Sequence, residues 1–193
     1  MSVLILGLAL FLGAHSVRIF ADGWRDAQLA RLGEARWKGL FSLLSATGLG
    51  LIVWGYAMAR AEAPILWTSP SWTRHLAALL TLSAFVLLVA AYLPRSHIQA
   101  AIGHPMVAGV KLWALAHLLA NGGLADVVLF GAFLVWAVAD FASARRRDRI
   151  AGKTHAVCCW TRDASVPAIG LLAWTLFALW GHAWLIGVRP FGA

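Results

Sequence analysis

The chain has 193 residues, of which 61% are hydrophobic and only 12% are charged, and its mean hydropathy is +0.77. This balance excludes an ordinary soluble domain and predicts a polytopic membrane protein in contact with the lipid bilayer. The formal net charge of +8 does not indicate a nucleic-acid-binding protein, because no basic face with stacking aromatic side chains accompanies it.

Six apolar segments are expected to cross the hydrocarbon core, which is roughly 30 Å thick and takes about 20 helical residues. They cover residues 2–21, 38–59, 74–93, 105–121, 124–142 and 164–187. The first lacks the positive start and the small-residue cleavage site of a signal peptide, so we expect it to be retained. The expected fold class is all-α: one integral-membrane helical bundle over residues 1–193.

The basic residues of the connections predict how the bundle is oriented. Most Arg and Lys residues lie in or beside the first, third and fifth connections. The positive-inside rule therefore places these connections in the cytoplasm and both termini outside it. The fourth connection is only residues 121–123, which predicts an antiparallel hairpin of the fourth and fifth spans.

Two spans carry histidines at expected membrane depth. In GAHSVRI (13–19), His15 precedes Arg18 by one helical turn. In the fourth span Gly109, Trp113 and His117 form one stripe, with a glycine where another helix or a flat ligand has room to approach.

A buried imidazole needs a partner, which leaves two interpretations of these histidines. One is a hydrogen bond between helices. The other is axial ligation of a haem iron, since a flat apolar cofactor suits the interior of a bundle. His104 and His117 do not bind one iron together, because thirteen residues separate them by about 20 Å.

The remaining polar residues of these spans also have alternative roles. His104 precedes Pro105 and is interpreted as a helix-entry residue, since proline is favourable at the first helical position. His182 is an alternative ligand, whereas His75, His97 and His155 lie in connections or at an interface. Lys111 either extends to the cytoplasmic surface or, with Arg18, pairs with haem propionates.

Other catalytic or metal-binding chemistry has little support in the sequence. The acidic residues are scattered, and only Asp126 and Asp140 lie in a span or at its edge. The motifs of serine hydrolases, zinc proteases, phosphate loops and CxxC redox sites do not occur. Cys158 and Cys159 are neighbours in a cytoplasmic connection and are interpreted as incidental.

Three stretches resemble the NnrU family of bacterial membrane proteins. They are GAHSVRI (13–19), HPMVAGVKLWALAHLLANG (104–122) and LFGAFLVWAVAD (129–140), and AHLLANG is the most specific part. The chain departs from the expected family pattern at Gly103 and Gly123, where Arg and Asp are expected.

The resemblance implies a location in the bacterial inner membrane and a link to denitrification, as a redox or accessory factor of nitrite and nitric oxide reduction. Relatives of the family include the haem-containing 15-cis-zeta-carotene isomerase, in which histidines of matching HS and AH motifs ligate haem b. Those positions correspond to His15 and His117. Arg18, Lys111, Trp113 and Gly109 are then the other expected cofactor-binding residues.

Whether the protein is an enzyme stays open at this point. If it is, the resemblance implies a haem-dependent cis–trans isomerase acting on a polyene. A cofactor-free scaffold for denitrification enzymes is the alternative. A membrane methyltransferase is a third hypothesis, but the pattern expected there has Arg and Tyr where this chain has Gly103 and Val107, and it needs a downstream acidic pair that this chain lacks.

Overall fold

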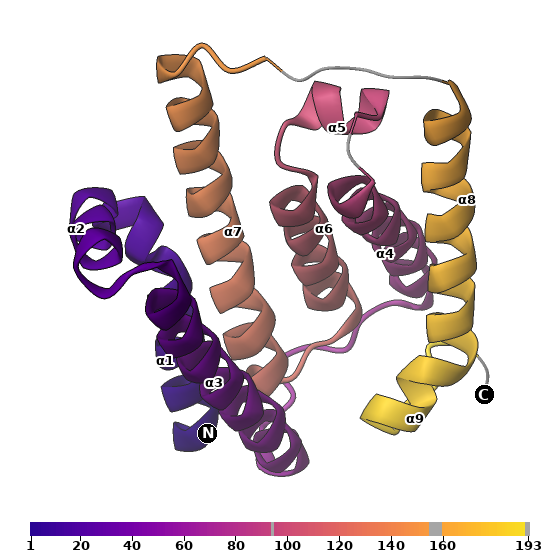
Figure 1. Ribbon diagram of the computed structural model, residues 1–193. Coiled ribbons are helices and arrows are strands. Elements are labelled where there is room, and N and C mark those ends of the chain that lie inside the picture. The colour runs from indigo at the N-terminus through magenta and orange to yellow at the C-terminus, as the bar shows by residue number, and fades with distance from the viewer. Residues whose placement is uncertain (94, 155–159, 192–193) are drawn as a thin grey trace. The chain divides into compact units, whose positions relative to one another are not determined.

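The computed structural model describes residues 1–93, 95–154 and 160–191, which form helices joined by short connections (Figure 1). The helices are α1 (Ser2–Phe20), α2 (Asp22–Leu32), α3 (Glu34–Glu62), α4 (Ser71–Tyr92), α5 (His97–Ile102), α6 (Pro105–Ala120), α7 (Leu124–Ile150), α8 (Trp160–Leu176), the π-helix η1 (Phe177–Gly181) and α9 (His182–Ile186). Within the described residues the only β pairing is an isolated bridge between Ile65 and Gly123. The all-α fold class is therefore confirmed.

Within residues 1–93, 95–154 and 160–191, five stretches of helix are long and apolar enough to cross a membrane. They are α1, α3, α4, α7 and the continuous run Trp160–Ile186. The fourth expected span corresponds to α6, which is apolar but has only 16 residues, or about 24 Å of helix. The chain is thus a helical membrane protein, and the expected orientation of its termini stays a prediction.

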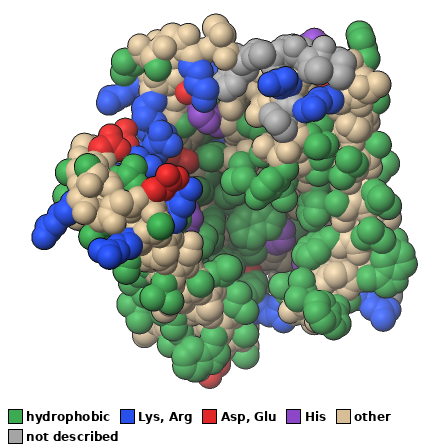
Figure 2. Space-filling model, viewed as in Figure 1, with side chains coloured by type: hydrophobic (Ala, Val, Ile, Leu, Met, Phe, Trp, Pro, Cys, Tyr) green, Lys and Arg blue, Asp and Glu red, His purple; other side chains and the backbone are tan. Residues whose placement is uncertain are grey.

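Two connections that were expected to be loops contain helices. Residues 22–32 form α2, which ends at Gly33, and residues 97–102 form α5, which ends at Gly103. Both glycines have φ of 78°, a conformation that favours glycine and stops a helix. Figure 2 shows charged side chains gathered over α2, whereas hydrophobic side chains cover the adjoining part of α3. The search for membrane spans missed α2 because its 11 residues are too few to cross the membrane and mix polar with apolar side chains.

The start of α6 agrees with the expectation from the sequence. Pro105 is its first residue and is buried, and the carbonyl of His104 accepts a hydrogen bond from Ala108 N–H at 3.1 Å. The proline therefore stands at a position where its missing N–H costs nothing. The expected role of His104 as a helix-entry residue is consistent with this geometry.

The described chain falls into two compact units. The first consists of Met1–Thr68 and Asn121–Ser143, and the second of Ser69–Ala120 and Ala144–Ala193. The expected single domain over residues 1–193 stays a prediction.

In the first unit α1 and α3 pack with almost no side chain between them. A β-carbon on Gly48 would lie 2.8 Å from the backbone nitrogen of Phe11, and one on Gly55 would overlap the backbone of Leu4. Gly7 on α1 meets the backbone of α3 in the same way. Glycine is needed at these positions because the two backbones approach each other directly, as small residues allow in membrane helices.

The connection after α3 is also held within the first unit. Leu66 N–H donates to Gly122 O at 2.7 Å, and Leu124 N–H donates to Pro64 O at 3.0 Å. Gly122 has no space for a side chain, because a β-carbon there would overlap the carbonyl oxygen of Trp67. These bonds satisfy backbone groups that no helix pairs, and they fix the start of α7.

In the second unit α4 lies between α6 and α8. A β-carbon on Gly109 of α6 would stand 3.0 Å from the carbonyl oxygen of Ala84, and one on Gly170 of α8 would stand 2.8 Å from the α-carbon of Val86. Small residues thus set the helix spacing in this unit too.

Replacing Gly48 with alanine is predicted to lower the free energy of unfolding by about 1–3 kcal/mol, because the methyl group would meet the α1 backbone. The measurement is the unfolding midpoint of the detergent-purified protein. The matched control is Gly50→Ala on the same helix, where a β-carbon meets nothing within 4 Å. There the midpoint should rise slightly, because alanine is the better helix former. Equal effects of both substitutions would contradict the packing described.

Candidate functional site

His15 on α1 is the first of the two histidines that the sequence singled out. It is half-buried, and its Nδ1 lies 2.7 Å from the carbonyl oxygen of Phe11, one turn earlier. A carbonyl oxygen only accepts, so in the neutral imidazole Nδ1 carries the proton and Nε2 carries the free lone pair. Within the described residues Nε2 makes no hydrogen bond.

Aromatic rings from three helices of the first unit surround this imidazole. The ring of Phe11 stacks on it with centroids 4.2 Å apart, and Phe41 of α3 meets it at 5.0 Å. Trp136 of α7 stands edge-on at 6.0 Å with an angle of 88° between the ring planes. These rings fix the orientation of the imidazole and keep much of it away from water.

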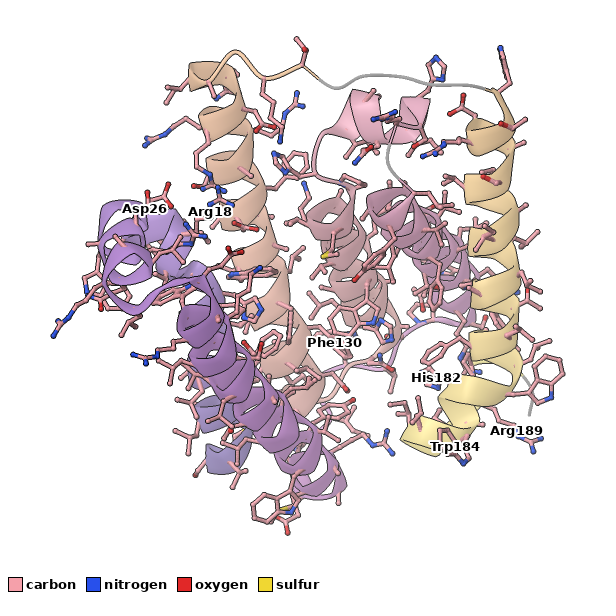
Figure 3. All side chains as sticks on the ribbon, in the orientation of Figure 1. Arg18, Asp26, Phe130, His182, Trp184 and Arg189 are labelled. Atoms are coloured by element: carbon pink, nitrogen blue, oxygen red, sulfur yellow. The ribbon has the colours of Figure 1, made fainter. Side chains whose placement is uncertain are left out.

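Arg18 lies one turn further along α1, at the end that leads into α2. Figure 3 shows it close to α2, where Asp26 is also labelled. Its side chain is 58% exposed, and its Nε lies 3.7 Å from a carboxylate oxygen of Asp22. The expected contact of Arg18 with a haem propionate stays a prediction.

His117 on α6, in the second unit, has the same local geometry as His15. Its Nδ1 lies 2.9 Å from the carbonyl oxygen of Trp113, one turn earlier, and the two rings are tilted with centroids 5.3 Å apart. The imidazole is half-buried. The carbonyl again selects the tautomer that carries its proton on Nδ1.

Two other residues that were expected to bind a cofactor, Gly109 and Lys111, also lie on α6. Gly109 is buried against α4, so another helix, one of the two partners expected, occupies the space beside it. Lys111 is half-buried, and its pairing with a haem propionate stays a prediction. That His15 and His117 bind a common iron stays a prediction, since the two residues belong to different units.

The remaining described histidines have other partners or are exposed. In the second unit His104 Nε2 lies 2.8 Å from Asp148, and His97 Nδ1 lies 2.5 Å from Asp163. His182 Nδ1 lies 2.7 Å from Val188 O, and His75 is exposed. His155, Cys158 and Cys159 lie outside the described residues.

One polar cluster was missed by sequence reasoning. Asp126 in the first turn of α7 is only 8% exposed, and Tyr56 of α3 donates to its carboxylate at 2.5 Å. Gly123 N–H donates to the other carboxylate oxygen at 3.1 Å, and the guanidinium of Arg60 lies 5.9 Å from the Tyr56 ring centre. Asp126 was visible in the sequence as an acidic residue in an apolar segment, which indicates a functional or bonded group. The sequence did not identify Tyr56, 70 residues away, as its partner.

No three His, Cys, Asp or Glu side chains gather in the part of the chain that the structure describes. A haem iron needs no such group, because the porphyrin supplies its equatorial ligands and the protein adds only one or two axial ones.

The apolar helices define an all-helical membrane protein, in which His15 and His117 each contact a carbonyl oxygen of their own helix. The family model described as "NnrU protein" matches residues 3–190, and the chain belongs to this family. The resemblance seen in the sequence is thereby confirmed. No curated protein and no solved structure gives a significant match to the chain.

Tyr56→Phe is predicted to lower the free energy of unfolding by about 1.5–3 kcal/mol, because a hydrogen bond to a buried carboxylate is lost. The chain offers a matched control, since its other tyrosine, Tyr92, is 71% exposed. Tyr92→Phe should change stability by less than about 0.5 kcal/mol. The free energies of unfolding of both variants are measured in the same detergent. Equal losses of stability would rule out a special role for the Tyr56–Asp126 bond.

Proposed function

We propose that this protein is a haem b-binding NnrU protein of the bacterial inner membrane, with His15 and His117 as the axial ligands. The observation that supports this most is shared by the two residues. In each, Nδ1 is engaged by the carbonyl oxygen one turn earlier, so the neutral ring carries its lone pair on Nε2. A metal-binding histidine typically has its other nitrogen bonded in this way.

The residues around His15 fit such a role. Phe11, Phe41 and Trp136 hold the imidazole plane and limit the access of water, and an apolar setting of this kind tunes a haem potential. Arg18 and Lys111 are the cations that would pair with the propionates. Bound haem would supply one-electron redox chemistry, while the chain would hold the iron at Nε2 and keep water away.

The biological role we infer is that of a redox or accessory factor linked to nitrite and nitric oxide reduction. Membership of the NnrU family supports it, together with the resemblance described above. The same resemblance supports an isomerase-like activity on a polyene as the reaction to look for, if the protein turns over a substrate.

The absorption spectrum of the purified protein tests the proposal. Full-length protein produced with ample haem supply should show a Soret band, and this band should be lost or shifted in His15→Ala and in His117→Ala, because each substitution removes an axial ligand. His75→Ala removes an exposed histidine and is the control that should leave the spectrum unchanged.

Two results would contradict the proposal. A colourless wild-type protein would show that no haem is bound and would favour the cofactor-free scaffold. A spectrum that is the same in all three variants would show that the haem is bound elsewhere. Unfolding midpoints of the variants exclude simple misfolding as the cause of a lost band.

A further inference from the structure

One face of α7 is exposed along the second half of the helix. Val135 and Val138 are 72% and 52% exposed, and Ala142, Arg146 and Arg149 are exposed as well. These five residues follow one another at steps of three or four, so at 3.6 residues per turn they lie within an arc of about 80°. All five belong to one continuous helix, and helix geometry alone aligns them. They are called the outer face of α7 below.

The outer face of α7 changes from apolar to cationic along the helix. Val135, Val138 and Ala142 offer apolar surface, and Arg146 and Arg149 follow with two guanidinium groups one turn apart. The eleven residue steps from Val135 to Arg146 span about 16 Å, which is close to one leaflet, or half of the roughly 30 Å hydrocarbon core. The outer face therefore has the length and the polarity of one phospholipid.

The nearby carboxylates do not neutralise these two arginines. The second unit contains only two acidic residues, Asp148 and Asp163. A carboxylate oxygen of Asp148 lies 2.8 Å from Nε2 of His104, and Asp163 accepts the first N–H of α5 at 2.8 Å. Within the described residues no ion pair joins Arg146 or Arg149 to a carboxylate. The cationic end of the outer face can therefore attract an anion from outside the chain.

The chemistry of the occupant follows from these features. A soluble anion would pair with the arginines but would leave the apolar part of the outer face uncovered. A zwitterionic lipid would cover that part but would bring its own cation next to two guanidinium groups. An anionic phospholipid covers the apolar part with an acyl chain and offers its phosphate to the arginines, whose planar fork suits phosphate oxygens. Basic clusters directly after a membrane helix are typical of such lipid contacts.

We propose that the outer face of α7 binds an anionic phospholipid. An acyl chain lies along Val135, Val138 and Ala142, and the phosphate accepts hydrogen bonds from Arg146 and Arg149. The proposal stands on the exposure, spacing and charge of one helix face, and it holds whether or not haem is bound.

The test is native mass spectrometry of the delipidated full-length protein, titrated with phosphatidylglycerol or with phosphatidylcholine of the same acyl chains. The wild type should bind the first phosphatidylglycerol about twentyfold more tightly than the first phosphatidylcholine. Arg146→Gln and Arg149→Gln should each reduce this preference about fivefold, because each removes one cation beside the phosphate. The matched control is the double variant Arg74→Gln, Arg189→Gln, which removes two exposed cations outside α7 and should keep the preference.

Two further measurements on the wild type need no variant and keep the test decisive if a variant fails to fold. Inorganic phosphate at millimolar concentration should not displace phosphatidylglycerol, because it does not cover the apolar part of the outer face. A rise in salt from about 0.05 M to about 0.5 M should lower the preference for phosphatidylglycerol, since salt screens exposed charges.

Four outcomes would overturn the proposal. Equal binding of the two lipids by the wild type would leave the arginines to an acidic segment of another protein, and displacement by inorganic phosphate would assign them to a soluble anion. An unchanged preference in both arginine variants would place the lipid elsewhere. An equal loss in the control would make net charge, rather than this face, the cause. None depends on the Soret band, so this proposal and the proposed haem function can fail independently.

Discussion

The direct contact of the α1 and α3 backbones is the constraint on which the first unit depends. With no β-carbon at Gly48 or Gly55, α3 meets α1 closely enough that Phe41 reaches the imidazole of His15. A larger residue at either glycine would move α1 away from α3 and separate the His15 imidazole from Phe41.

A second constraint comes from the scarcity of water in an apolar interior, where each polar group needs a partner within the protein. His15 and His117 each hydrogen-bond to the carbonyl oxygen one turn earlier. The carboxylate of Asp126 accepts hydrogen bonds from Tyr56 and from Gly123 N–H. The buried indole N–H of Trp136 has no hydrogen-bond acceptor within the described chain.

Much of the fold could be predicted from the sequence, because a long apolar segment has few alternatives to a membrane helix. The start of α6 followed from Pro105. The HS and AH motifs singled out His15 and His117, whose role as ligands stays a prediction. Helices α2 and α5 were missed, since helices of 11 and 6 residues are too short to give the apolar signal that identifies a span.

The surroundings of the site could not be predicted. In a helix that is apolar on all sides, nothing in the pattern distinguishes Phe41 or Trp136, which contact His15, from residues that face lipid. The partners Tyr56–Asp126 and His104–Asp148 are far apart in sequence, and only the packing of their helices brings each pair together.

We propose above that Nε2 of His15 binds a haem iron. The most direct measurement is the electron paramagnetic resonance of the oxidised protein containing ¹⁵N-histidine, with hyperfine detection of nitrogen. The account predicts a low-spin ferric signal coupled to two imidazole nitrogens, one of which is lost in His15→Ala. A signal with unchanged nitrogen coupling in that variant, or no haem signal at all, would contradict it.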